Sequence, residues 1–185
     1  YWLKNQDSQN SHFNLLELVS TQRAVTNYVK ILTGREIPVN FVDPRGDSMT
    51  DGESIEIASR INHKNVDEVV GLALHEASHC ILTDFKIVKK LGNVILQDHK
   101  YKHLFPNRDH VFLFTNFMED RRIDDFVYNS APGYKAYYES MYESSFFNDT
   151  IDKGLKGTEY RTETWESYMF RIINMFNPNS DLDAL

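Results

Sequence analysis

One helix that must be buried while carrying charged and polar groups constrains this fold more than any other feature. The segment GLALHEASHCIL, Gly71 to Leu82, places His75, Glu76 and His79 among apolar residues on nearly every side of a predicted helix. A helix that is apolar all round belongs in a protein interior. Burying two imidazoles and a carboxylate without partners costs on the order of several kcal/mol. We therefore expect a metal ion or compensating groups to meet this helix.

The spacing of the two histidines predicts a metal site. His75 and His79 are one helical turn apart, so their Cβ atoms lie about 6 Å from each other. Imidazoles at this separation can converge on one zinc ion, which binds nitrogen at about 2.0–2.1 Å. Glu76 is rotated by about 100° from His75, which favours a role as general base over a role as ligand. The alternative is a pair of hydrogen-bonded core histidines that bind no metal.

A catalytic zinc ion has three protein ligands, so a third is expected elsewhere in the chain. The segment TNFMEDRRIDD, Thr115 to Asp125, offers the best candidates. Glu119 falls on an apolar stripe and is favoured as the third ligand, whereas Asp120, on a more polar stripe, is the alternative. The carboxylate that does not bind zinc is expected to accept a hydrogen bond from a ligand histidine. The competing interpretation, a solvated face with acid–arginine pairs, suits Arg121 and Asp125 better.

Bulk composition argues against several partners. The formal net charge of -7 argues against a nucleic-acid surface, which needs clustered lysine and arginine. No apolar run approaches the length of about 20 residues that a membrane-spanning helix needs. Cys80 is the sole cysteine, so no disulfide can form within the chain, and a cytoplasmic location is expected. His99 and His103 are also four apart but lack an acidic neighbour, which favours a surface pair.

The pattern of apolar residues predicts an α+β fold, with a small β-sheet packed on several helices that include the buried one. We expect one domain over 1–185, with a core at about 37–128 and a helical C-terminal part at about 129–185. Because the chain starts at Tyr1 and not at Met, we also expect it to be trimmed from a longer protein. The predicted strands are 37–43 and 54–59; the predicted helices are 11–32, 65–83, 107–128, 134–146 and 162–176, with a less regular segment at 92–103.

The order of a strand, a turn, a second strand and then a helix with HEASH resembles the zincin metallopeptidases. An acidic third ligand on a later helix is similar to the gluzincin branch of that family, in which the ligand is a glutamate followed four residues later by an aspartate. Here Ile123 follows Glu119 at that spacing, whereas Asp124 follows Asp120, so both candidates stay open. The segment NFMEDRRID is also similar to metallopeptidase-like domains found beside von Willebrand A domains in bacterial and phage proteins.

The resemblance implies a zincin-like fold, one Zn²⁺ ion and hydrolysis of peptide bonds in a peptide or protein substrate. Glu76 would be the general base, and the strand 54–59 could pair with an extended substrate. The alternative function is a non-catalytic zinc-binding interaction or regulatory module of an assembly with a von Willebrand A domain and an AAA+ ATPase. An oxyanion donor is also expected, and the candidates are Tyr134, Tyr137, Tyr138 and Arg122.

Overall fold

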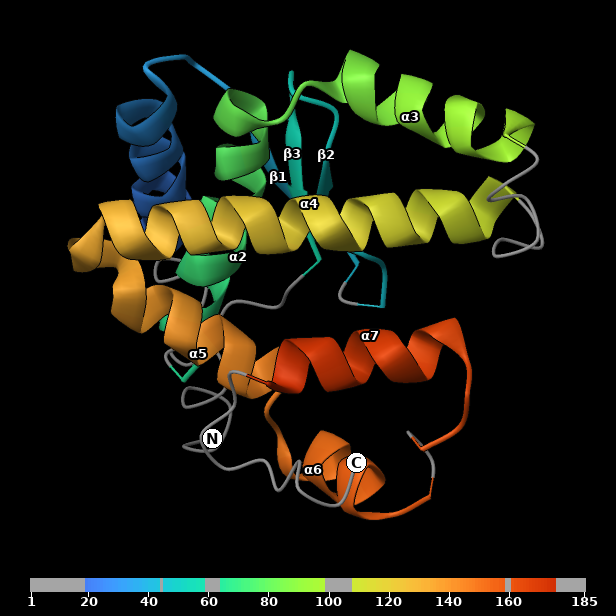
Figure 1. Cartoon of the computed structure of the whole chain (residues 1–185). Coiled ribbons are helices and arrows are strands. Elements are labelled where there is room, and N and C mark those ends of the chain that lie inside the picture. The colour runs from blue at the N-terminus through green and yellow to red at the C-terminus, as the bar shows by residue number, and fades with distance from the viewer. Residues whose placement is uncertain (1–18, 44, 59–63, 99–107, 159–160, 176–185) are drawn as a thin grey trace, which may run out of the picture.

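The computed structural model describes residues 19–43, 45–58, 64–98, 108–158 and 161–175 and shows an α+β protein in which helices predominate (Figure 1). A helix over residues 19–33 precedes a sheet of three short strands, and the remaining helices follow the sheet. The elements are β1 (Val39–Phe41), β2 (Met49–Thr50), β3 (Ile55–Ile57), α2 (Val66–Leu82), α3 (Phe85–Gln97), α4 (Arg108–Ser130), the short 3-10 helix η1 (Pro132–Tyr134), α5 (Lys135–Ser145), α6 (Asp149–Lys156) and α7 (Trp165–Asn174).

The sheet has the order β1-β3-β2, with β3 parallel to β1 and antiparallel to β2. Ile55 and Ile57 are both 0% exposed, as the alternating pattern in this segment predicts. The strand expected at 54–59 is therefore present, but it is central and paired on both sides, so the expectation that it pairs with an extended substrate is wrong. Within the described sheet the free edges are β1 and β2. Two residues are too few to show periodicity, which is why β2 was not predicted.

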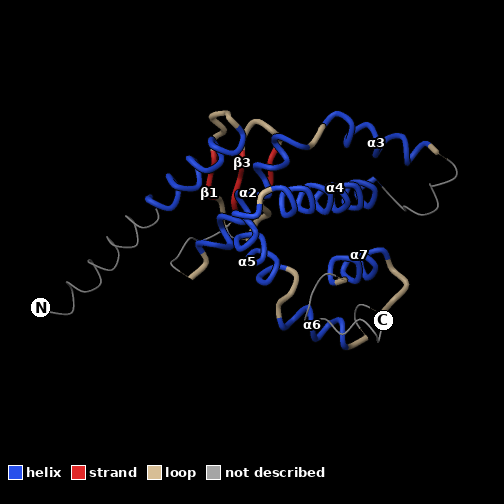
Figure 2. Tube along the Cα trace, turned by 60° about the vertical axis from the view of Figure 1, so that its left-hand side comes forward, coloured by secondary structure: helices blue, strands red, loops and turns tan. Residues whose placement is uncertain are grey.

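Helix α2 lies between the sheet on one side and helices α4 and α5 on the other (Figures 1 and 2). One core cluster joins the helix 19–33, the sheet and α2, and it includes Val29, Ile55 and Val69. A second cluster joins α2 to α4 and α5, and it includes Leu74 and Tyr138. The buried helix expected from the sequence is therefore the centre of the molecule. Its two histidines lie in its C-terminal half, on the side of α4.

The crossing of α2 and α5 depends on a glycine. A Cβ atom at Gly71 would lie 2.4 Å from the carbonyl oxygen of Tyr137 and 2.9 Å from Cβ of Met141, both on α5. Backbone atoms at such distances cannot give way without moving the helix. Gly71 therefore allows α5 to approach α2 closely, and this approach positions the residues of α5 that reach the centre of the protein.

We expect Gly71→Ala to lower the free energy of unfolding by about 1–3 kcal/mol, because the new methyl group overpacks the helix crossing. The measurement is urea denaturation of the metal-free protein. Gly133→Ala is a suitable control, since a Cβ atom at Gly133 meets nothing within 4 Å. If Gly71→Ala and Gly133→Ala shifted the urea midpoint of the unaltered protein equally, the close crossing of α2 and α5 would be contradicted.

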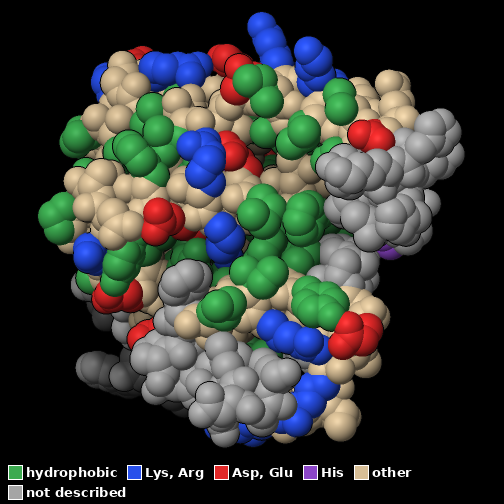
Figure 3. Space-filling model, in the orientation of Figure 1, with side chains coloured by type: hydrophobic (Ala, Val, Ile, Leu, Met, Phe, Trp, Pro, Cys, Tyr) green, Lys and Arg blue, Asp and Glu red, His purple; other side chains and the backbone are tan. Residues whose placement is uncertain are grey.

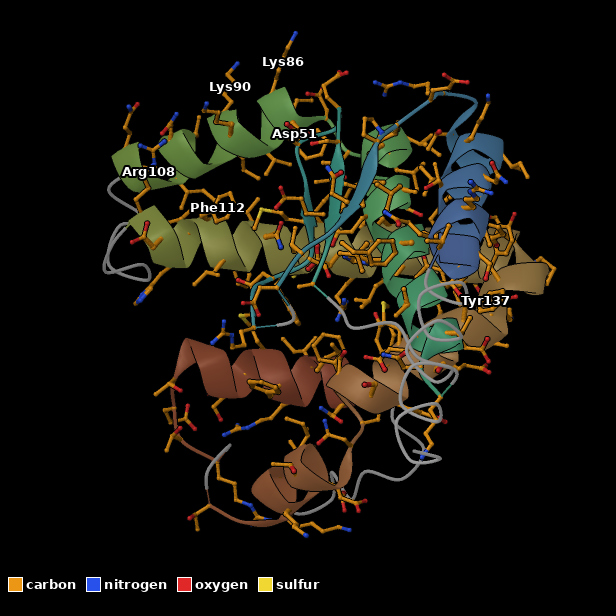
Figure 4. All side chains as sticks on the ribbon, turned by 180° about the vertical axis from the view of Figure 1, so that it is seen from behind. Asp51, Lys86, Lys90, Arg108, Phe112 and Tyr137 are labelled. Atoms are coloured by element: carbon orange, nitrogen blue, oxygen red, sulfur yellow. The ribbon has the colours of Figure 1, made fainter. Side chains whose placement is uncertain are left out.

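The outer helices differ more from the sequence prediction than the central ones. Helix α3 begins at Phe85, where the Asp84 side chain accepts hydrogen bonds from two backbone N–H groups of the first turn. The prediction had only a less regular segment from residue 92, so the start of α3 was missed. Lys86 and Lys90 project outward from α3 (Figure 4). Helix α6 was missed as well, and it lies with α7 beyond α5 (Figure 2).

Some hydrophobic side chains stay on the surface. Helix α4 exposes Phe112, Leu113 and Met118, and α7 exposes Tyr168 and Ile172. Figure 3 shows hydrophobic side chains gathered on the face between these two helices. Among the described residues, no helix is both long and apolar enough to cross a membrane.

Candidate metal centre

Three side chains from two helices converge beside the middle of α4. His75 and His79 project from the same side of α2, with ring centroids 4.9 Å apart. Oδ1 of Asp120, on α4, lies 3.1 Å from Nε2 of His79 and 3.8 Å from Nε2 of His75. The three ligand atoms all lie within 4.8 Å of one another. Ligand atoms around a tetrahedral zinc ion lie about 3.3 Å apart, so this cluster has the dimensions of a metal site.

The other nitrogen of each ring, Nδ1, is also hydrogen-bonded. Nδ1 of His75 lies 2.7 Å from Oδ1 of Asp124, and a carboxylate can only accept, so this nitrogen carries the proton. Nδ1 of His79 lies 2.9 Å from Oγ1 of Thr83. Thr83 gives its own proton to Glu119 at 2.6 Å, so its oxygen accepts from His79. A neutral ring that donates from Nδ1 in this way has its lone pair on Nε2, which at His79 lies 3.1 Å from Oδ1 of Asp120.

Positive charge between the rings and Asp120, from a proton or a metal ion, would stabilise this arrangement. Two lone pairs on Nε2 and a carboxylate oxygen would repel one another at the observed distances. A proton on one ring or a divalent ion among the three atoms removes the repulsion. Two imidazoles and one carboxylate are a donor set that zinc prefers, and a partner for the second nitrogen of each ring is typical of histidines that bind metals. The donor set therefore fits the expected ion.

The preference for Glu119 over Asp120 as third ligand is reversed by this geometry. Asp120 joins the histidines, whereas the carboxylate of Glu119 is occupied by Thr83 and by a bidentate contact with Arg122, at 2.6 and 2.7 Å. Glu119 reaches His79 only through the Thr83 hydroxyl. Contrary to the expectation, Glu119 therefore does not accept a hydrogen bond from a ligand histidine; Asp124 does so instead, from His75. Thr83 is the C-cap residue of α2, directly after Leu82, and the sequence analysis did not single it out.

Glu76 lies beside the cluster with its side chain largely buried, at 6% exposure. Burial raises the pKa of this carboxyl group, and the neighbouring His75 and His79 partly offset that rise. No hydrogen bond from the described residues contributes to this pKa. The carboxylate is therefore available as a proton acceptor, and its raised pKa brings it closer to the range that suits a general base near neutral pH.

The four candidates for an oxyanion donor are engaged in other contacts. Tyr134 and Tyr137 pack edge-on against Tyr28, with ring centroids 5.0 and 6.4 Å away, and Figure 4 shows Tyr137 next to the helix 19–33. Tyr138 is 2% exposed, and its hydroxyl lies 3.3 Å from Oγ of Ser78. Arg122 donates to Glu119 and, at 2.7 Å, to the carbonyl of Leu82. None of these contacts is with His75, His79 or Asp120, and the donor stays a prediction.

Other residues singled out from the sequence lie apart from this cluster. Cys80 contacts Oγ1 of Thr50 at 3.3 Å and donates to the backbone oxygen of Glu76, and burial raises the pKa of its thiol. A thiol of this kind is a poor nucleophile. His99 and His103 lie outside the described residues. Comparison of the chain with protein-family models, with curated proteins and with solved structures gives no match. The site must therefore be interpreted from its own chemistry.

Zinc binding is expected to strengthen as the pH rises from neutral to about 9. Burial alone would lower the pKa of His75, but the Asp124 carboxylate outweighs it and the pKa rises to about 9. Because this lies above the value of 6.5 for an unperturbed histidine, the proton on His75 stabilises the metal-free fold at low pH, and that contribution is lost as the pH passes 9. Zinc must displace this proton, so its affinity should rise about tenfold per pH unit and level off above the pKa. Calorimetric titration in zinc buffers measures this slope, and a flat profile would contradict the proton on His75.

Proposed function

We propose that this protein is a zinc-dependent metallopeptidase of the zincin type. The observation that carries the proposal is that ligand atoms of His75, His79 and Asp120 lie within 4.8 Å of one another, with the largely buried carboxylate of Glu76 beside them. Within the described residues three ligands converge, which suits a catalytic zinc with one open position better than a closed structural site. Asp124 follows Asp120 by four residues. This spacing is similar to that of gluzincins, in which an aspartate follows the ligand glutamate by four residues.

Each residue of the cluster has a defined task in this proposal. His75, His79 and Asp120 hold the ion, while Asp124 and Thr83 keep the two rings in the tautomer that presents Nε2. Zinc, when bound, supplies Lewis-acid chemistry that polarises a carbonyl and makes water nucleophilic at neutral pH. Glu76 accepts the proton of the attacking water and passes it to the leaving amine nitrogen as the carbon–nitrogen bond breaks.

The edge strand β2 offers a place for an extended peptide. It lies against the C-terminal half of α2, where Oγ1 of Thr50 contacts Cys80, the residue directly after His79. Strand β2 has β3 on one side and, in the described sheet, no strand on the other. A substrate that added to this edge as a further strand would pass close to the metal ligands. This replaces the strand 54–59, which is central, as the proposed substrate edge.

The test is hydrolysis of an unstructured protein substrate such as casein by zinc-loaded protein. Activity should be lost with a chelator, return when zinc is added and be absent from the protein without metal. Cleavage products identified by mass spectrometry should show new amino termini, because the proposed reaction breaks peptide bonds. Stoichiometric zinc binding without any cleavage would favour the non-catalytic zinc module, and its assembly with a von Willebrand A domain or an AAA+ ATPase stays a prediction.

A further inference from the structure

Asp124 is a buried carboxylate that receives three hydrogen bonds. Asp124 is 4% exposed, and its Oδ1 accepts a hydrogen bond from Nδ1 of His75 at 2.7 Å. Its Oδ2 accepts from the hydroxyl of Tyr142, on α5, at 2.7 Å and from Nη2 of Arg121 at 3.1 Å. One oxygen thus faces His75, and the other is held by Tyr142 and Arg121. These contacts fix the carboxylate at both ends.

Arg121 is held in place by aromatic rings and not by other hydrogen-bond acceptors. Its guanidinium carbon lies 5.2 Å from the ring centroid of Phe117, 5.1 Å from that of Tyr142 and 5.4 Å from that of Phe146. Its Nε and Nη1 atoms are buried without a hydrogen-bond partner in the described part of the chain. Among the described residues, the guanidinium donates its hydrogen bond to Asp124. A guanidinium enclosed in this way is costly to bury, and rings around it reduce that cost through cation–π attraction.

The position of His75 depends on this arrangement. The Nδ1–H bond to Asp124 aims Nε2 of His75 at Asp120, and it holds only while the carboxylate keeps its orientation. Loss of the Tyr142 hydroxyl or of the Arg121 guanidinium would leave Oδ2 with one donor in place of two, so the carboxylate could rotate more easily about its Cβ–Cγ bond. The ring of His75 would then lose its fixed direction. Partners of this kind, one contact removed from a ligand, set the affinity of many metal sites.

We propose that Arg121 and Tyr142 are positioning residues that hold Asp124 against His75 and thereby raise the affinity of the site for zinc. This inference rests on the proposed zinc site, and it assigns to α5 a role that the sequence analysis did not give it. Tyr142 packs with Phe146 and Phe147 at 5.4 Å, but its hydroxyl points at the residue that orients a ligand.

The test is zinc affinity measured by competition with a chromophoric chelator. Tyr142→Phe keeps the ring and removes the hydroxyl, and we expect zinc to bind about tenfold more weakly. Tyr128→Phe is the matched control, because Tyr128 also links α4 to α5 by donating to a carboxylate, Glu139 at 2.8 Å, but does not reach the metal ligands. Its affinity should equal that of the unaltered protein. Arg121→Lys keeps the charge and should lose less affinity than Arg121→Gln.

A double-mutant cycle separates positioning from general support of the fold. Asp124→Asn weakens the link to His75, so Tyr142→Phe should have little further effect on affinity in that background. Loss of the same factor in both backgrounds, or no loss in either, would overturn the inference while leaving the zinc site in place. Failure of the unaltered protein to bind zinc would overturn the proposed function and the inference together. Chemical denaturation of the metal-free variants shows whether any loss of affinity reflects unfolding.

Discussion

Glu76→Gln is expected to lower kcat for peptide hydrolysis by a factor of about 100 to 10,000, while zinc still binds with unchanged stoichiometry. The amide of glutamine cannot take the proton of the attacking water, and this is the range that positioned general bases contribute. Glutamine has nearly the same volume as glutamate, so it fits a side chain that is 6% exposed. Steady-state kinetics on a fluorogenic peptide give kcat, and metal analysis of the same sample gives the zinc content.

The matched control is Glu68→Gln, a change of the same kind in the first turn of α2. Glu68 lies on the same helix but about two turns before Glu76, and we expect the activity of this variant to equal that of the unaltered protein. Activity that survives Glu76→Gln would contradict the general-base mechanism even if zinc binding were confirmed. Loss of zinc from that variant would show instead that Glu76 supports the metal.

Asp120→Ala is expected to weaken zinc binding more than about 100-fold, because it removes a ligand and not only a supporting group. The reason is geometric, since Oδ1 of Asp120 lies within 3.8 Å of both ligand nitrogens. Glu119→Ala is the informative comparison, because it removes the neighbouring carboxylate from the same turn of α4. Its expected loss is only about tenfold, through the Thr83 hydroxyl that supports His79. Isothermal titration with zinc measures both.

The order of these two losses decides which acid is the ligand. A larger loss for Glu119→Ala than for Asp120→Ala would restore the preference drawn from the sequence and would contradict the geometry of α4. Because Glu119 also holds Arg122, which caps the carbonyl of Leu82 at the end of α2, its variant should be less stable as well. Thermal unfolding of both metal-free variants separates that effect from ligand loss.

The central helix could be predicted from sequence because its apolar residues surround it on nearly every side. The α+β class and the approximate bounds of α4, α5 and α7 could also be predicted from sequence. The choice of third ligand depended on the rotation of α4 about its axis. On the apolar stripe that carries Glu119, Phe112 and Phe126 are 59% and 54% exposed although Ile123 is buried, whereas Asp124, on the stripe of Asp120, is 4% exposed. Adjacent residues differ by about 100°, so this change of face exchanges Glu119 for Asp120.

Features that arise from contacts between distant segments gave no local signal. The hydroxyl of Tyr142 reaches Asp124 only because α5 crosses α2 at Gly71, and nothing in the spacing of the aromatic residues indicates that crossing. Strand β2 is defined by its pairing with β3 and not by its own pattern. The spacing of Asp120 and Asp124 was visible in the sequence, and together with the gluzincin resemblance it was the best available indication of the observed arrangement.

X-ray diffraction from crystals of the zinc-loaded protein, collected on both sides of the zinc absorption edge, tests the central claim most directly. We expect one anomalous peak, with Nε2 of His75, Nε2 of His79 and a carboxylate oxygen of Asp120 at about 2.0–2.2 Å from it. Absence of a peak in zinc-replete protein, or a peak coordinated by other side chains while the two rings turn away from each other, would contradict the account.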